Sequence, residues 1–270
     1  MRGVAMLLGL LAAGSASAGE IKLAAADGTA LHAVEYGSGA NGVVLIHDKG
    51  RSATDFSWYS EKLASAGFHV VAVDLRGHGG SKPPDVLTDL DYPKMTGDVA
   101  AAVAYLKSKG ATKVALIGDK LGANLAIVEA ADDLTVTNVI ALSAGLNVAG
   151  VTVSTAIEKY GTRPLLLVAS AEDAYATRTA GLLEEKALGE KHFEILENAG
   201  SGIKMLNKTP SLEPVMLSWL NGTYFQKPGA KPDGTTPTVG IETQGIQTTG
   251  AKYGDAPPPE KPKGPVDLDE

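Results

Sequence analysis

The sequence predicts an α/β fold with a mainly parallel sheet and helices on both faces. Two features support this prediction. Continuous apolar runs at residues 42–47, 69–73 and 113–117 are typical of strands that are buried on both faces. Helical patterns alternate with these runs along the chain, which is typical of a parallel sheet covered by its crossover helices.

The first half of the chain predicts a hairpin and two strand–helix units. Asp27-Gly28 is a hairpin turn signal between strands at 21–25 and 30–36. The strand at 42–47 is followed by a helix over 52–67, which starts in Ser/Thr/Asp residues and ends at a glycine. The strand at 69–73 is followed by a polar loop and a helix over 92–109.

The second half continues the alternation. The strand at 113–117 leads into a helix that continues to about residue 130. Further strands are predicted at 138–142, 164–168 and 192–197, and helices near 152–160, 177–188 and 211–220.

The N-terminus has the pattern of a secretory signal peptide over residues 1–18. Arg2 precedes an apolar segment, and Ala16 and Ala18 form an A-x-A type site, so cleavage is expected before Gly19. An uncleaved membrane anchor is the alternative, but the apolar segment is short for a bilayer span. We therefore expect a secreted or periplasmic protein without a transmembrane segment after cleavage.

The C-terminal region has a different composition. Eight of the chain's 14 prolines follow Gly222, among many Gly, Thr and Lys residues. Such a segment buries too little apolar surface to offset its ordering entropy. We predict a folded domain over 19–222 and a disordered tail over 223–270, which is either passive or binds a partner.

Composition narrows the function. The chain contains no cysteine, so a thiol nucleophile and disulfides are excluded. Its formal net charge is −7, and the sequence has no basic stripe, which argues against nucleic acid as a partner. The partner is expected to be an unidentified small ligand or protein, and no cofactor or metal site is expected.

The segment Gly118-Asp-Lys-Leu-Gly122 has the glycine frame of the G-x-S-x-G nucleophile elbow. Three other segments occur in the order expected around such an elbow: 47–50, 74–81 and 169–173. With them, the chain resembles the α/β-hydrolase superfamily, nearest to its small esterase, lysophospholipase and serine-peptidase-like members. The resemblance implies a three-layer α/β-hydrolase fold, and the short span between residues 142 and 164 implies that it has no cap domain.

The resemblance also assigns the catalytic positions. The nucleophile, acid and histidine of the triad correspond to Lys120, Asp173 and Ser201. A serine hydrolase needs a serine activated by a histidine that a carboxylate orients. Two of the three residue types are therefore replaced.

Two arrangements of the replaced residues are considered. In the first, Lys120 forms an ion pair with Asp173, and Ser201 adds a hydrogen bond. In the second, Lys120 acts as a base for Ser201 in a Ser-Lys dyad. Lys120 could also form a Schiff base.

The oxyanion-loop positions implied by the resemblance are Asp48, Lys49 and Leu121. Leu121 retains its backbone N–H, whereas Asp48 and Lys49 stand where the family prefers glycine. Asp48 points either into the hole or outward to Lys49 or Arg51. The function predicted from all these features is that of an exported pseudo-hydrolase with a binding or scaffolding role. The alternative is a serine-type ester or peptide hydrolase with an atypical Lys/Ser/Asp site.

Overall fold

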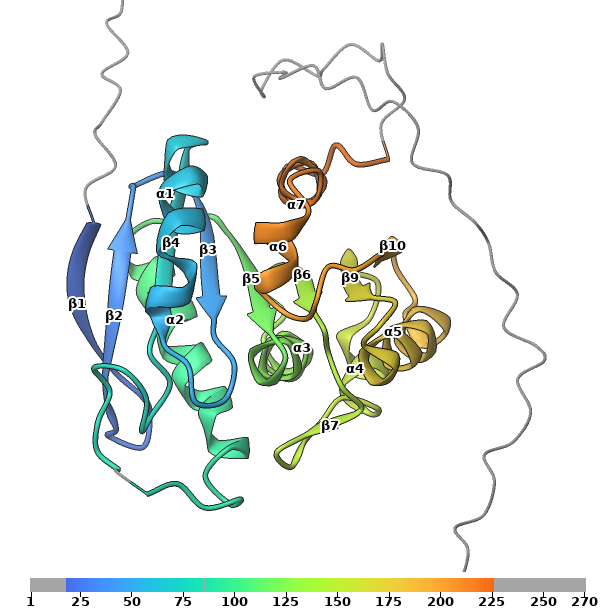
Figure 1. Ribbon diagram of the computed structural model, residues 1–270. Coiled ribbons are helices and arrows are strands. Elements are labelled where there is room, and N and C mark those ends of the chain that lie inside the picture. Colours follow the sequence, from blue (N-terminus) through green and yellow to red (C-terminus); the bar gives the residue numbers. More distant parts are fainter. Residues whose placement is uncertain (1–17, 85, 226–270) are drawn as a thin grey trace, which may run out of the picture. The chain divides into compact units, whose positions relative to one another are not determined.

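An eight-stranded sheet runs through the protein (Figure 1). The computed structural model describes residues 18–84 and 86–225. In spatial order the strands are β1 (Ala18–Ala24), β2 (Ala30–Tyr36), β4 (Phe68–Val73), β3 (Asn41–Ile46), β5 (Lys113–Asp119), β6 (Val136–Leu142), β9 (Leu165–Ser170) and β10 (Lys191–Leu196).

The predicted mainly parallel sheet is confirmed. From β4 to β10 all neighbouring strands pair in parallel, while β1 and β2 form an antiparallel hairpin whose second strand pairs antiparallel with β4. The turn of this hairpin contains Asp27 and Gly28, as predicted, and Gly28 has a φ of 85°. Because the carboxyl ends of parallel strands share one edge, the loops after β3, β5, β6 and β9 lie together there.

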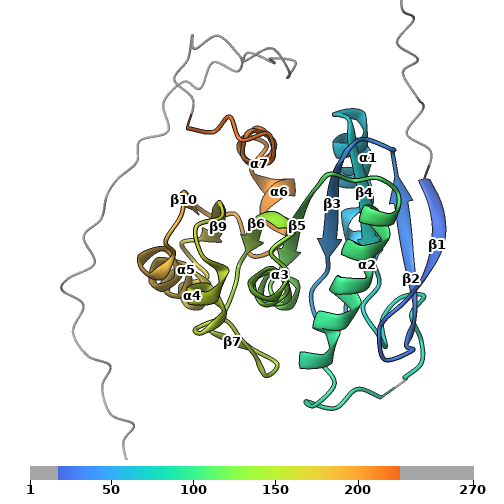
Figure 2. The same ribbon diagram turned by 180° about the vertical axis from the view of Figure 1, so that it is seen from behind.

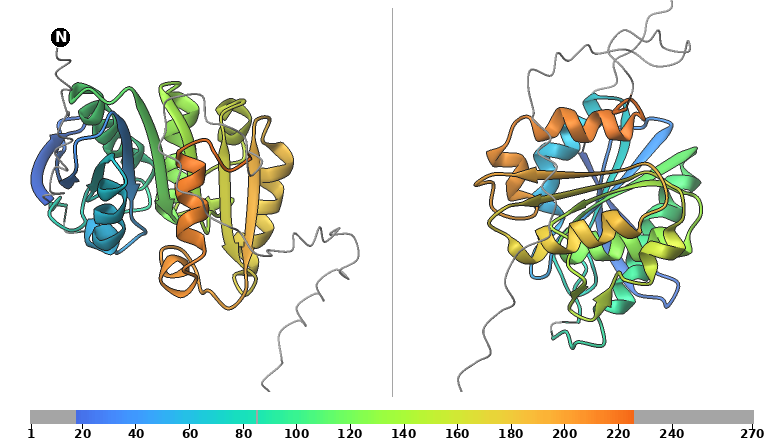
Figure 3. Two further views of the ribbon diagram at one scale, coloured as in Figure 1. Left: turned by 90° about the horizontal axis from the view of Figure 1, so that it is seen from above. Right: turned by 90° about the vertical axis from the view of Figure 1, so that its right-hand side faces the viewer.

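Helices cover both faces of the sheet, so the predicted three-layer architecture is also confirmed (Figure 3). One face packs against α1 (Ser57–Ser65), α6 (Lys204–Lys208) and α7 (Leu212–Leu220). The other face packs against α2 (Thr96–Ser108), α3 (Leu121–Asp132), α4 (Ala156–Tyr160) and α5 (Ala174–Lys186), which Figure 2 shows. Short 3-10 turns, η1 (Ala53–Phe56) and η2 (Pro93–Met95), precede α1 and α2.

The segment between β6 and β9 differs from the predicted helix over 152–160. It contains a small hairpin, β7 (Asn147–Val148) and β8 (Val151–Thr152), and α4 begins only at Ala156. Ala149 and Gly150 join the two strands with positive φ angles of 49° and 82°, as a tight two-residue hairpin turn requires. This hairpin and α4 stand where a cap domain would be inserted.

Two predictions concern residues outside the described part of the chain. The signal peptide lies there except for Ala18, and so do residues 226–270 of the predicted tail. Among residues 18–84 and 86–225, no helix has the length and apolar character that a bilayer-spanning segment requires.

Candidate functional site

The elbow between β5 and α3 forms as the glycine frame predicts. Lys120 connects the strand to the helix with a φ of 47° and a ψ of −100°, a conformation that non-glycine residues rarely adopt. A Cβ atom on Gly118 would lie 2.1 Å from the carbonyl oxygen of Gly122. A Cβ atom on Gly122 would lie 2.1 Å from the carbonyl oxygen of Ile46. Both positions therefore need glycine for the turn to close.

Asp48 points into the elbow. Its carboxylate oxygen Oδ1 accepts a hydrogen bond from the backbone N–H of Lys49 at 2.7 Å and a longer one from that of Leu121 at 3.2 Å. These donors come from the loop after β3 and from the first residue of α3, so they converge on one oxygen from two elements. Of the two orientations considered for Asp48, the structure has the inward one.

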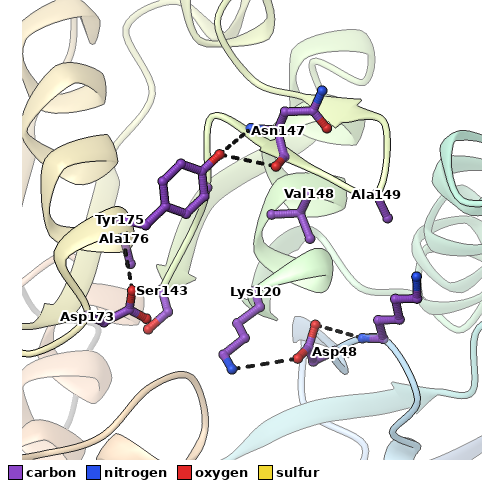
Figure 4. A pocket seen from close by; sticks show the side chains of 11 residues that line it. Asp48, Lys120, Ser143, Asn147, Val148, Ala149, Asp173, Tyr175 and Ala176 are labelled. Atoms are coloured by element: carbon purple, nitrogen blue, oxygen red, sulfur yellow. Dashed lines mark hydrogen bonds and ion pairs between the residues drawn. The ribbon is translucent and has the colours of Figure 1, made fainter. Parts of the chain in front are cut away.

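Lys120 pairs with Asp48 and not with Asp173. Its ammonium Nζ lies 3.9 Å from Oδ2 of Asp48, and its side chain is 39% exposed. The predicted ion pair between Lys120 and Asp173 is therefore wrong (Figure 4). It failed because the Asp48 carboxylate is held across the elbow by the two backbone N–H groups, next to the lysine.

Asp173 has a different local partner. It is the N-cap of α5, where its Oδ1 accepts a hydrogen bond from the backbone N–H of Ala176 at 3.1 Å. Such a cap satisfies one of the free donors at the start of a helix. Asp173 still lines the same cavity as Lys120 and Asp48.

Ser201 lies in a turn that neighbouring groups hold in place. Glu172 accepts a hydrogen bond from the Gly200 N–H at 2.7 Å, and the hydroxyl of Ser143 accepts one from the Gly202 N–H at 2.9 Å. The Ser170 hydroxyl and this N–H of Gly200 lower the pKa of Glu172 to about 2. Ser201 is not among the residues that line the cavity, although the next residue, Gly202, is hydrogen-bonded to Ser143, which does line it.

The cavity has a volume of about 580 Å³ and opens at the carboxyl edge of the sheet. One wall is the β7–β8 hairpin, which Tyr175 holds because its hydroxyl accepts a hydrogen bond from the Asn147 N–H at 3.1 Å. The same hydroxyl donates to the carbonyl oxygen of Asn147 at 3.2 Å. The lining residues are Asp48, Lys49, Lys120, Ser143, Gly145, Asn147, Val148, Ala149, Asp173, Tyr175 and Ala176.

Comparison with known proteins agrees with this geometry. Residues 39–170 match the family model described as serine aminopeptidase, S33. Solved structures with the same fold include an esterase from Pyrococcus furiosus, with a TM-score of 0.63 and 15% identity over 77% of this chain and 91% of that one. The dienelactone hydrolase from Anabaena variabilis has a TM-score of 0.66 and 16% identity over 77% of this chain and 98% of that one.

The chain has the α/β-hydrolase fold.

Curated relatives match it over a shorter stretch. Epoxide hydrolase A of Mycobacterium tuberculosis is 36% identical over 105 residues, which are 38% of this chain and 31% of the relative. The human serine hydrolase BPHL is 35% identical over 108 residues, 40% of this chain and 36% of the relative. The match thus spans about a third of the length of each of these relatives.

In an α/β-hydrolase, the N–H of the residue after the nucleophile and an N–H from the loop after the third strand form the oxyanion hole. In this chain Leu121 and Lys49 supply those two groups, and both donate to the Asp48 carboxylate. The Asp48 carboxylate therefore occupies the position that corresponds to the oxyanion hole of that family.

The two histidines near the hole have structural roles. The Nδ1–H of His47 donates to the carbonyl oxygen of Asp48, and its Nε2 accepts from the Leu75 N–H. His78 likewise donates to the carbonyl oxygen of Arg76 and accepts from the Gly50 N–H. Burial lowers the pKa of His47 to about 4. Each ring uses one nitrogen for the oxyanion loop and the other for the segment after β4, so neither is available as a base.

Asp119 was not selected from the sequence, although it lies inside the elbow. Its side chain is 5% exposed, and Oδ1 has no hydrogen-bond partner in the described part of the chain. Burial raises the pKa of its carboxyl to about 7, and the negative charge of Asp48 acts in the same direction. A Cβ atom on Gly202 would lie 1.8 Å from Oδ1 of Asp119, so the Ser201 turn packs directly against this acid.

No three His, Cys, Asp or Glu side chains in residues 18–84 and 86–225 converge closely enough to hold a metal ion.

Proposed function

We propose that this α/β-hydrolase-fold protein is a pseudo-hydrolase, which uses the former active-site cavity for binding or scaffolding. The observation that carries the proposal is the position of Asp48, whose carboxylate accepts from both oxyanion-hole donors. Acyl transfer on this fold needs that hole for the negative charge that develops on the substrate oxygen. A resident carboxylate blocks the position and repels the charge.

The residue types at the elbow and the late turn support the same proposal. Lys120 stands at the nucleophile position and Ser201 at the histidine position, so neither the attacking hydroxyl nor its usual base is present where the fold places them. His47 and His78 do not replace the base, because both nitrogens of each ring are hydrogen-bonded to backbone groups of the oxyanion loop and of the segment after β4.

We further propose that the protein is exported. The support is the pattern of residues 1–18, with one positive charge, an apolar segment and small residues at 16 and 18. Mass spectrometry of the protein from its source cells tests this part. A mature N-terminus at Gly19, found in the periplasmic or extracellular fraction, is the expected result, and an intact Met1 in the membrane fraction would contradict it.

The test of inactivity uses the mature chain, a fluorophosphonate probe and short p-nitrophenyl esters. We expect no covalent labelling and no turnover above the buffer rate. Ester turnover that disappears in both Lys120→Ala and Ser201→Ala would overturn the proposal and support the atypical Lys/Ser/Asp hydrolase. Glu61→Ala, an exposed change on α1, serves as the matched control because it leaves the cavity untouched.

A further inference from the structure

The protein already holds one carboxylate in its cavity, namely its own. Asp48 Oδ1 receives two backbone N–H groups, and Oδ2 lies 3.9 Å from the ammonium of Lys120. These two N–H groups and the ammonium are thus arranged to bind a carboxylate. We propose that the cavity binds a small monocarboxylic acid with an apolar body, whose carboxylate replaces that of Asp48 in the hole. This inference rests on the proposed non-catalytic binding function.

The recognition elements come from three parts of the chain. The loop after β3 gives the Lys49 N–H, and the start of α3 gives the Leu121 N–H. The 12-residue α3 also directs the positive end of its dipole at the same place. Lys120 supplies the full positive charge, and at 3.9 Å its contact with Asp48 is longer than a hydrogen bond. Its ammonium therefore has donors left for a ligand carboxylate.

Asp48 has a position to occupy when it leaves the hole. Arg51, three residues further along the same loop, is exposed and forms an ion pair with Asp55. Hydrogen bonding to Asp55 raises the pKa of Arg51, and the charge of Asp48 adds to this effect, so the two residues interact electrostatically. When Asp48 turns outward, it stays near Arg51 while the ligand pairs with Lys120. Arg51 is then shared between Asp55 and Asp48, and its exposed guanidinium is the nearby positive charge for both.

The remaining walls select the body of the ligand. Val148, Ala149 and Ala176 present apolar groups, and the ring of Tyr175 lies beside them. Asp173 lies on the same side of the cavity as Tyr175 and Ala176 and disfavours a second carboxylate by like-charge repulsion. About 580 Å³ accommodates a short aliphatic or a single-ring aromatic acid.

Titration calorimetry with benzoate and butyrate tests the exchange, with benzamide as the uncharged control. We expect Asp48→Ala to bind benzoate at least tenfold more tightly than the unmodified protein, because the internal competitor is gone. In the same background Lys120→Met should weaken benzoate binding at least tenfold. Asp48→Asn, whose amide oxygen can still accept in the hole, should bind benzoate with an affinity between those of the unmodified protein and Asp48→Ala. Glu61→Ala should bind as the unmodified protein does.

Two results would overturn the inference. One is equal affinity of Asp48→Ala and the unmodified protein for benzoate, with both folded by circular dichroism and melting. The other is binding of benzamide as tight as that of benzoate, which would mean that the carboxylate is not recognised. Either outcome leaves the labelling and ester assays unaffected, so failure of this inference is distinguishable from failure of the pseudo-hydrolase proposal.

Discussion

Asp48 and Leu121 are 73 residues apart in sequence, yet the carboxylate Oδ1 of the first lies 3.2 Å from the backbone nitrogen of the second. This contact ties the loop after β3 to the first turn of α3. The same oxygen also accepts from Lys49 at 2.7 Å. The backbone of the elbow is therefore formed in this protein, while the Asp48 side chain occupies the anion-binding position.

The role of Asp173 as a helix cap can be separated from a role as an ion-pair partner. We expect Asp173→Ala to lower the free energy of unfolding by about 1 kcal/mol, the usual cost of losing an N-cap. Asp173→Asn should cost only a few tenths of a kcal/mol, because asparagine caps helices as well as aspartate does. Urea unfolding of both variants measures the difference. Equal losses in the two variants would mean that the charge, and hence a partner such as Lys120, matters more than the cap.

Lys120 adopts its backbone conformation at a cost. With a φ of 47°, a side chain at this position is strained by about 1–3 kcal/mol, whereas glycine is not. We therefore expect Lys120→Gly to be more stable than Lys120→Ala by about 1–2 kcal/mol in thermal or urea unfolding. The two variants lose the same contact with Asp48, so their difference isolates the backbone term.

The matched control for Lys120 is an exposed position within a helix. At Arg178 in the interior of α5, glycine should be less stable than alanine by about 1 kcal/mol, the opposite sign. If Lys120→Ala were also more stable than Lys120→Gly, the backbone at position 120 would not be strained.

The sequence was sufficient for most of the fold. Strands buried on both faces, such as β3 and β5, have continuous apolar runs, and the Gly118–Gly122 frame marks the elbow because sterics leave no alternative there. The helix predicted at 152–160 was wrong over its first residues. There the pairing of Val151 and Thr152 with 147–148 depends on a turn at Ala149-Gly150, which is a weak signal in the sequence.

The site was less predictable than the fold. The topology brings Lys120 and Asp173 to one edge of the sheet, and this much followed from the order of the elements. The carboxylate that pairs with Lys120 is decided by side-chain rotamers and by backbone donors a few ångströms apart. The spacing of residues along the sequence predicts neither of these. Asp119 was missed for a similar reason, because a buried acid with one unpaired oxygen among the described residues is recognised only from its surroundings.

Restoring a hydrolase requires that the hole be emptied as well as that the triad be rebuilt. We expect Lys120→Ser combined with Ser201→His to remain unlabelled by a fluorophosphonate probe, because Asp48 still occupies both donors. Adding Asp48→Gly frees the hole, and labelling should appear. Loss of one oxyanion donor alone costs about 10²–10³ in rate, so the third change is expected to raise labelling by at least that factor.

The order of the changes is the control in this series. Asp48→Gly by itself should stay unlabelled, since it lacks a hydroxyl nucleophile at position 120. Equal labelling of the double and triple variants would mean that Asp48 leaves the hole readily and does not block it.

Asp119 should make the stability of the protein depend on pH. Burial raises the pKa of its carboxyl from 3.8 to about 7 in the folded chain, so the folded state holds a proton that the unfolded state has already released. The contribution to stability is full below about pH 4, falls as the pH rises, and is lost above about pH 7. Each pKa unit corresponds to about 1.4 kcal/mol, so the total change is a few kcal/mol.

The measurement compares the protein with Asp119→Asn by urea unfolding from pH 4 to pH 8. Because asparagine does not ionise, the variant should gain stability relative to the unmodified protein as the pH rises, and the difference should level off above about pH 7. Glu129 on α3 is also buried with a pKa raised to about 7, and His47 has a lowered pKa. These groups are the same in both proteins, so their contributions cancel in the difference. A difference that is constant across the range would mean that Asp119 is charged in the folded state over the whole range.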